Sequence, residues 1–320
     1  MTSFKIGNNP HEISEFINHL KNTFKITTLG SVFGMEDTGV YCNHLINILD
    51  KLRANIVLEN PLHIKKSLGL IRGKNDKADA LRIAGFLLKG RDGLVTRNAR
   101  REVIDDLARL SSLRNRLVNV EKVLATPLKE DRGFIKISKS DIHVELCKAS
   151  LVSLKADIER LERYIQQVWS LDDKVNHLMQ LITSVPGVGP ITALQIIIAT
   201  NEFKKISDPR KFACYCGVAP FEHSSGTSVR GKTRVSKIAN RKLKTLLSAC
   251  ALSARRFVPE IKAYYERRTL VDKKHKMSVM NAIRFKIITR VFACVKREQS
   301  YQKNFKPIDA GHGLANSADS

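Results

Sequence analysis

The chain has 320 residues, and its 55 Lys and Arg against 31 Asp and Glu give a formal net charge of +24. A basic excess of this size favours a polyanionic partner, and nucleic acid fits better than a membrane because no apolar run reaches the roughly 20 residues that span a bilayer. Residues 1–14 also lack the apolar core of a signal peptide, so we expect a cytoplasmic protein without membrane contact.

The first part of the chain, residues 1–95, alternates strand and helix patterns, which predicts an α/β domain with a sheet covered by helices. Strands are expected at apolar runs, and helices where apolar residues recur at helical spacing. The expected strands are the end of one at 4–6, then 31–36 and 55–59, and the expected helices are 10–21, 40–52 and 76–89.

The middle of the chain, residues 96–183, is expected to form a helical arm. Apolar residues recur at steps of four and three along 147–168, which is the a/d pattern of a coiled coil. An earlier periodic segment covers about 99–124, and Pro127 and Gly133 mark a linker at about 126–140. Two long antiparallel helices are therefore predicted, and the pattern fits pairing within one chain as well as between chains.

The C-terminal part, residues 184–306, is expected to be mostly helical with a basic loop at 221–237, and the small polar residues of 307–320 predict a disordered tail. The six cysteines are scattered. Cys214 and Cys216 form a CxC pair without a second pair nearby, which favours reduced thiols over a zinc site.

Residues 186–190 form a Pro-Gly-Val-Gly-Pro turn between two apolar segments, which is the pattern of a helix-hairpin-helix. Gly187 and Gly189 allow a tight turn, and main-chain N–H groups at the start of the second helix can bind a DNA phosphate. Such contacts position DNA without reading its sequence. The alternative is a turn used only for packing.

A stretch rich in hydroxyls and cations begins at His223. Nine Lys and Arg lie between Glu222 and Arg256, and Glu222 is the only acid there, so this stretch is suited to phosphates. A serine in such surroundings can act as a nucleophile on phosphorus, and Ser225 precedes a glycine that lets a strand approach closely. An ordinary Ser/Gly/Thr loop is the alternative. The cations expected to bind nucleic acid are Arg230, Lys232, Arg234 and Lys237.

Three carboxylates in the first domain suit a hard divalent ion such as Mg²⁺. Glu36 ends a predicted strand, and Asp76 and Asp79 are three residues apart at the start of a predicted helix, so they share one helical face. Magnesium at these oxygens would support phosphoryl transfer. Taken alone, the two aspartates also fit ordinary N-terminal helix charges.

Together these segments resemble the insertion-sequence transposases that carry a RuvC-like DEDD domain and a serine-bearing C-terminal domain, a family of bridge-RNA-guided recombinases. The resemblance covers about residues 1–300. The segments that carry it are 36–41, 74–80, 186–190, 217–220, 225–228 and 236–237.

The resemblance implies an RNase H-like (RuvC-like) N-terminal domain, a coiled-coil arm and a helical C-terminal domain with a helix-hairpin-helix. It implies that Glu36, Asp76 and Asp79 are three of four carboxylates that hold Mg²⁺. It implies that Ser225 links covalently to DNA, with Ser224 and Ser228 as less favoured candidates. It further implies a homo-oligomer (dimer or tetramer), a structured guide RNA, and a nucleoid-associated protein acting on double-stranded DNA.

Two departures from the family pattern bear on activity. The family begins with a strand carrying Gly-Ile-Asp, whereas no Asp precedes Asp37 here, so we expect the first strand and first carboxylate to be missing through truncation or a misplaced start. Ala239 stands where the family usually has glycine in a Ser-Lys-x-Gly-Asn run, although Asn240 is retained.

The leading hypothesis is a transposase that catalyses Mg²⁺-dependent strand exchange through a serine–DNA intermediate. The main alternative is a catalytically inactive, truncated transposase that only binds nucleic acid. A structural coiled-coil assembly protein would show no salt-dependent affinity for DNA or RNA, and a helix-hairpin-helix nuclease would leave no covalent adduct.

Overall fold

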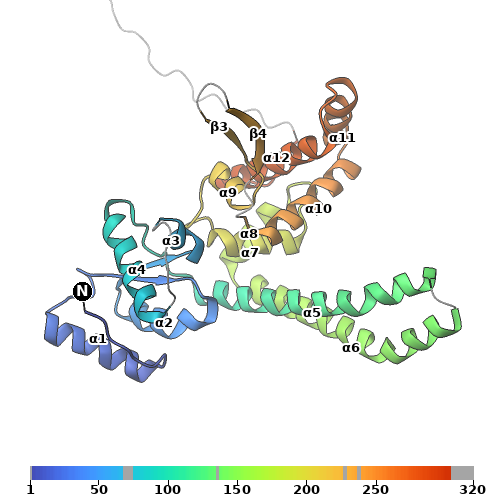
Figure 1. Cartoon of the computed structure of the whole chain (residues 1–320). Coiled ribbons are helices and arrows are strands. Elements are labelled where there is room, and N and C mark those ends of the chain that lie inside the picture. Colours follow the sequence, from blue (N-terminus) through green and yellow to red (C-terminus); the bar gives the residue numbers. More distant parts are fainter. Residues whose placement is uncertain (1, 68–74, 135–136, 226–228, 236–238, 304–320) are drawn as a thin grey trace, which may run out of the picture. The chain divides into compact units, whose positions relative to one another are not determined.

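The computed structural model describes residues 2–67, 75–134, 137–225, 229–235 and 239–303, with the backbone alone at 131–133, 137–140, 221–225 and 229–234. The chain divides into two compact units, residues 1–99 and 100–320, which are taken in turn (Figure 1).

The first unit contains a two-stranded parallel sheet. Strand β1 (Val32–Glu36) pairs with β2 (Asn55–Glu59), and the register sets Glu36 opposite Glu59 at the carboxyl ends. The chain crosses between the strands through the 3₁₀ turn η1 (Gly39–Cys42) and helix α2 (Asn43–Lys51). Both strands were predicted from the apolar runs, and Glu36 does end its strand as expected.

Helices pack around this sheet and close a small core. Alongside α2 they are α1 (Pro10–Phe24), α3 (Pro61–Ser67) and α4 (Asp76–Lys89), followed by the short turn η2 (Arg91–Gly93). Leu49 and Ile56 are fully or almost fully buried in this core. Gly34 lets α4 approach β1, because a Cβ at that position would overlap the Leu87 side chain. The bounds of α4 match the predicted 76–89.

The strand expected to end at residues 4–6 is not formed. The segment has no regular structure, and the Phe4 ring instead packs on α1, with its centroid 5.4 Å from that of Phe16 and 6.3 Å from that of Phe24. A short segment without a strand partner gains more when its apolar side chain covers the apolar face of a helix.

The second unit begins with two long helices that run side by side, α5 (Glu102–Phe134) and α6 (Ile137–Ser170) (Figure 1). The residues of α6 at the predicted contact positions are half-buried or buried, while most residues between them are exposed. The predicted linker was too long, because α5 continues through Pro127 to Phe134. A helix tolerates an internal proline at a cost of about 3 kcal/mol when its other contacts hold it.

The rest of the second unit is a helical bundle around one large core. Ile104 and Leu107 of α5 belong to this core with no exposed surface, so the base of the arm is anchored in it. The bundle helices are α7 (Asp173–Thr183), α8 (Pro190–Thr200), α9 (Pro209–Tyr215), α10 (Arg241–Phe257), α11 (Pro259–Glu266), the π turn η3 (Arg267–Val271) and α12 (Lys276–Arg297).

The basic segment predicted as a loop is a β-hairpin. Strand β3 (Pro220–Ser225) pairs antiparallel with β4 (Val229–Val235), with an irregularity between Phe221 and His223. The prediction was wrong because the many cations and hydroxyls were taken to indicate a loop. Val229, Thr233 and Val235, which favour strands, in fact alternate with cations along β4.

Within the described part of the chain, no helix is both long enough and apolar enough to cross a membrane.

Candidate functional site

Glu36 is held where the sheet meets a tight turn. Its main-chain carbonyl accepts hydrogen bonds from the Thr38 N–H (3.0 Å) and the Cys42 thiol (3.0 Å), and the next residue, Asp37, donates its N–H to the Glu59 carbonyl (2.9 Å). Gly39 then adopts a φ of +73°, which a side chain would disfavour. This turn fixes the backbone of Glu36 at the carboxyl edge of the sheet, where α/β proteins commonly bind ligands.

Asp76 and Asp79 lie in the first turn of α4. The turn is capped by Asn75, whose side-chain oxygen accepts the Ala78 N–H at 2.7 Å. Asp79 also forms an ion pair with Arg82 at 2.5 Å. The two aspartates therefore share a helix start as predicted, and one of them is already neutralised by a cation.

The donor type of this set suits a hard divalent ion, since all three groups offer carboxylate oxygens. Among the residues that the structure describes, however, no three His, Cys, Asp or Glu side chains come together closely enough to hold a metal ion. The assignment of Glu36, Asp76 and Asp79 as metal ligands stays a prediction.

The glycine turn predicted as a hairpin joins α7 to α8, and its two glycines have different surroundings. Gly187 has a φ of +91°, and a Cβ there would lie 2.8 Å from the Cys250 carbonyl oxygen and 2.9 Å from the Ala254 Cβ. Both neighbours belong to α10. Gly187 is therefore required for the turn to pack against α10, whatever it contributes to a nucleic acid.

Gly189 lies on the open side of the same turn. It is exposed, it caps α8 with extended backbone angles, and a Cβ there would meet no atom within 4 Å. Pro190 and Ile191 beside it are also exposed, whereas the rest of α8 is mostly buried. If the hairpin binds a phosphate, this edge is the accessible part of it.

Ser225 is the last residue of β3, and the register sets it opposite Val229. The preceding residue, Ser224, lies opposite Arg230. Lys232 and Arg234 follow in β4, so three of the four predicted cations share the hairpin with the serine. Ser228 and Lys237 lie outside the described residues.

Sequence reasoning missed an ion-pair cluster at the base of the arm. Arg101, just before α5, donates to both carboxylate oxygens of Asp172 (2.7 and 2.8 Å) and to Glu202 (2.7 Å). The Glu202 side chain has no exposed surface, and Lys174 and Lys204 also approach it at 3.6 and 3.3 Å. Burial opposes the charge of Glu202, but the hydrogen bond and charge of Arg101 outweigh it, so its pKa is lowered.

This cluster joins three segments that are distant in sequence. Asp172 caps α7 by accepting the Val175 N–H at 2.9 Å, and Glu202 lies in the loop after α8, where three consecutive residues have positive φ. The only sequence feature that pointed to any part of the cluster was Asp172 before an apolar helix, a position typical of a helix cap. Its partner Arg101 is 71 residues away and could not be found from spacing.

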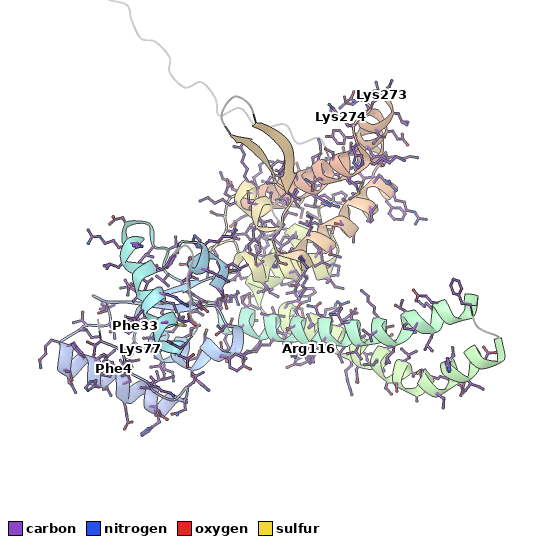
Figure 2. All side chains as sticks on the ribbon, in the orientation of Figure 1. Phe4, Phe33, Lys77, Arg116, Lys273 and Lys274 are labelled. Carbon is purple, nitrogen blue, oxygen red and sulfur yellow. The ribbon has the colours of Figure 1, made fainter. Side chains whose placement is uncertain are left out.

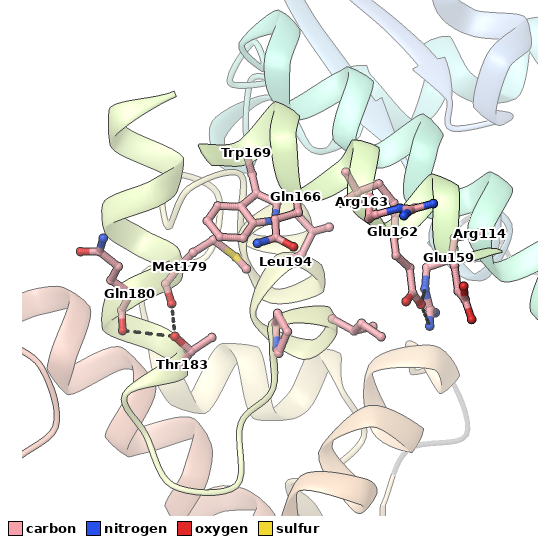
Figure 3. A pocket seen from close by; sticks show the side chains of 14 residues that line it. Arg114, Glu159, Glu162, Arg163, Gln166, Trp169, Met179, Gln180, Thr183 and Leu194 are labelled. Atoms are coloured by element: carbon pink, nitrogen blue, oxygen red, sulfur yellow. Dashed lines mark hydrogen bonds and ion pairs between the residues drawn. The ribbon is translucent and has the colours of Figure 1, made fainter. Parts of the chain in front are cut away.

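A hollow of about 690 Å³ lies where the arm meets the bundle, lined from α5, α6, α7 and α8 (Figure 3). Trp169, Met179 and Leu194 form its apolar part, and Arg114 pairs with Glu162 at its rim (2.5 Å). Trp169 is the only tryptophan of the chain and packs against the core of the second unit. Its fluorescence therefore reports on this unit.

Comparison with known proteins finds family matches in two parts of the chain. Residues 1–124 match the family DEDD_Tnp_IS110, described as transposase, and residues 179–266 match Transposase_20, the transposase IS116/IS110/IS902 family. The chain carries the domains of the IS110/IS116 transposases. The first match contains Glu36, Asp76 and Asp79, and the second contains the glycine hairpin and Ser225.

Similar proteins agree with this transposase assignment. The pilin gene-inverting protein of Moraxella bovis is 24% identical over 276 residues, which is 84% of this chain and 81% of that protein. The insertion element IS110 protein of Streptomyces coelicolor is 27% identical over 55% of this chain and 41% of its own length. The transposase of element IS1111A from Coxiella burnetii is 25% identical over 40% of this chain and 36% of its own length.

Proposed function

We propose that this transposase-family chain catalyses strand exchange of an insertion sequence through a covalent link between Ser225 and a DNA phosphate. The proposal is supported above all by the position of Ser225, at the end of a strand whose partner strand carries three cations, inside the segment that matches the IS116/IS110/IS902 family. The positive residues suit the phosphates of the DNA, and the serine supplies the nucleophile.

In the proposed step, the Ser225 Oγ attacks a DNA phosphorus. One Oγ–P bond forms and one P–O bond of the strand breaks, so the protein becomes a phosphodiester and the departing strand end takes up the proton that the serine gives up. The reverse attack by another strand's hydroxyl restores the serine and joins the exchanged strand. Arg230, Lys232, Arg234 and Lys237 are proposed to neutralise the phosphates on either side.

Glu36, Asp76 and Asp79 are proposed to hold Mg²⁺ within a RuvC-like fold. When bound, this ion would polarise a phosphate oxygen. The residues of this chain contribute the anionic oxygens, and the turn after β1 and the Asn75 cap fix the backbones that carry them. Replacing Glu36 with Gln should lower Mg²⁺ affinity, which calorimetry on the full chain measures without reference to activity.

The exposed edge of the hairpin, Gly189 with Ile191, is proposed to contact a DNA phosphate, while Gly187 contributes by fixing the turn. Finer parts of the proposal rest on the family resemblance. They are a coiled-coil role for α5 and α6 in forming a dimer or tetramer, and a structured RNA that guides the choice of DNA.

The deciding experiment traps the covalent intermediate. The full chain is incubated with labelled DNA carrying the ends of its element, then denatured, and the adduct is resolved by size and mapped by mass spectrometry. Ser225→Ala should abolish it, whereas the neighbouring control Ser224→Ala should retain it. An adduct that persists in Ser225→Ala and disappears in Ser224→Ala would move the nucleophile by one residue. Persistence in both variants would refute a nucleophile in β3.

A second candidate is a transposase-derived protein that only binds nucleic acid. It is supported by the arrangement of the acidic side chains, since no three His, Cys, Asp or Glu of the described residues form a group that could hold a metal ion. It predicts salt-dependent DNA binding with no adduct in the unaltered chain, and DNA binding that is unchanged in Glu36→Gln.

A further inference from the structure

Helices α10 and α11 meet at a sharp corner after Phe257 and leave a cleft of about 580 Å³ on the surface of the second unit. The predicted hairpin glycines, the serine strand and the acidic residues do not line it. The side chains that matter in it are Leu252, Arg255, Arg256, Phe257, Lys262 and Tyr265.

The lining of the cleft carries a net positive charge. Among the described residues, no carboxylate lies within ion-pair distance of Arg255, Arg256 or Lys262, and Glu266 is the only acid of the lining. Nearby cations are paired instead, as in Arg290 with Glu260 at 2.5 Å and Arg268 with Asp272 at 2.7 Å. Three cations against a single acid in the lining favour an anionic polymer.

The cleft also presents apolar surface that a folded chain normally covers. The Phe257 side chain is 70% exposed and Leu252 is 51% exposed. The Arg256 guanidinium lies 5.2 Å from the Phe257 ring centre, and the Arg255 guanidinium lies 4.9 Å from that of Tyr265. Tyr265 is half-buried, so the exposed Phe257 ring, with the Arg256 guanidinium beside it, is the surface on which a planar group can stack.

These two properties together select the ligand. A duplex hides the faces of its bases and offers only phosphates and groove edges, so an exposed phenylalanine would gain little from it. An unpaired strand offers both phosphates and open base faces, which stack on aromatic rings regardless of sequence.

We propose that the α10–α11 cleft binds a single-stranded DNA segment, with a base stacked on Phe257 and phosphates held by Arg256 and Lys262. The inference rests on the proposed function, because strand exchange must separate DNA strands at the point where they are cut and rejoined. Two further exposed lysines, Lys273 and Lys274, follow η3 (Figure 2).

The test is equilibrium binding of the full chain to a labelled 20-nucleotide single-stranded DNA, a blunt duplex of the same sequence and the matching RNA strand, by fluorescence anisotropy over a salt series. We expect Phe257→Ala to weaken single-strand binding by about 5- to 100-fold and to leave duplex binding unchanged. Arg256→Ala should reduce the slope of log affinity against log salt by about 0.7.

Two control variants match these changes outside the cleft. Leu270→Ala removes an apolar side chain that is 73% exposed, and Arg116→Ala removes an exposed arginine of the arm (Figure 2). Neither should alter the preference for single strands over duplex. Because Phe257 is mostly exposed, its loss should leave the thermal midpoint within about 2 °C of the unaltered chain.

Each outcome bears on the proposal separately from the proposed function. Unchanged single-strand affinity in Phe257→Ala, with normal duplex binding, would overturn the cleft and leave the recombinase proposal intact. Failure of the unaltered chain to bind any DNA would overturn the proposed function itself. If Phe257→Ala weakens binding to the RNA strand but not to single-stranded DNA, the assignment of a DNA strand is overturned. The same holds if Phe257→Ala weakens binding to anionic phospholipid vesicles but not to single-stranded DNA.

Discussion

The two glycines of the α7–α8 turn provide a matched test of what the hairpin does. Gly187→Ala places a methyl group 2.8 Å from the Cys250 carbonyl oxygen, at a φ of +91°. A left-handed backbone costs an alanine about 1 to 2 kcal/mol, and an overpacked contact with main chain costs about 1 to 3 kcal/mol. Alanine also restricts the unfolded chain, which offsets about 0.4 to 1 kcal/mol. The unfolding free energy should fall by about 2 to 4 kcal/mol.

Gly189→Ala is the control, since its added methyl group would meet no atom within 4 Å and its backbone is extended. Alanine is a poorer helix cap than glycine, and the restricted unfolded chain compensates, so the change should stay within about 1 kcal/mol. Both variants are denatured in urea and followed by the fluorescence of Trp169, which packs on the same core. For a unit of this size, the Gly187→Ala midpoint on heating should fall by roughly 4 to 16 °C.

Equal stability of the two variants would refute this reasoning, because it would mean that the turn does not pack against α10 as described. A loss of stability in Gly189→Ala alone would reverse the assignment of the packed and open sides of the hairpin. The expected pattern, with Gly187→Ala unstable and Gly189→Ala stable, makes Gly189 the position at which larger side chains test DNA contact without unfolding the protein.

Three further predictions concern buried charge. Arg101→Met should lower the unfolding free energy by about 2 to 4 kcal/mol in urea denaturation, since it leaves the buried Glu202 carboxylate with only two lysines, and an unchanged midpoint would contradict a structural role for the cluster. Hydrogen bonds from Arg101 lower the pKa of Asp172 and, despite burial, that of Glu202. The two carboxylates therefore stabilise the folded state fully above about pH 4.5, and this contribution to the unfolding free energy is lost as the pH falls below that value. In Arg101→Met, the unfolding free energy should decline less steeply with falling pH. Burial, with the charge of Arg114, lowers the pKa of Lys242 to about 8. Lys242→Met should therefore raise the unfolding free energy at pH 7 by about 0.5 to 1 kcal/mol, seen as a higher thermal midpoint. This gain should shrink as the pH rises from about 8 to about 10.5.

Periodicity predicted the elements that are held by local pattern. Helix α4 has the expected bounds because Asn75 caps it and its apolar face repeats at helical spacing. Both parallel strands were predicted as apolar runs, the second arm helix from the a/d spacing along 147–168, and the first from the earlier periodic segment at about 99–124. The errors arose where tertiary partners decide, as at Phe4, which packs on α1, and at Pro127, which α5 tolerates because the paired helix supports it.

For the candidate site, the sequence predicted the positions of residues within their own elements, whereas the roles of these residues stay predictions. Acidic residues at a strand end and a helix start could be read directly, but the Arg101 cluster joins residues up to 101 positions apart and has no local pattern. The α10–α11 cleft was not predicted either, because Arg255 was counted only as a positive charge, and it is the meeting of α10 with α11 that brings Tyr265 beside it. Charge can be summed from composition, whereas the alignment of a cation with a ring depends on how two helices meet.

The hairpin shows why a motif has to be separated into its residues before it is used as a functional signal. Both glycines fit the pattern equally well in sequence, yet Gly187 is required by a neighbouring helix and Gly189 faces open space. Packing against α10 therefore accounts for one glycine without any nucleic acid, and it leaves the second unexplained, since an exposed cap position accepts Asn, Asp, Ser or Thr at least as well. A backbone that must approach a phosphate closely would explain a glycine there, so Gly189 rather than Gly187 supports the interpretation that the hairpin binds a phosphate.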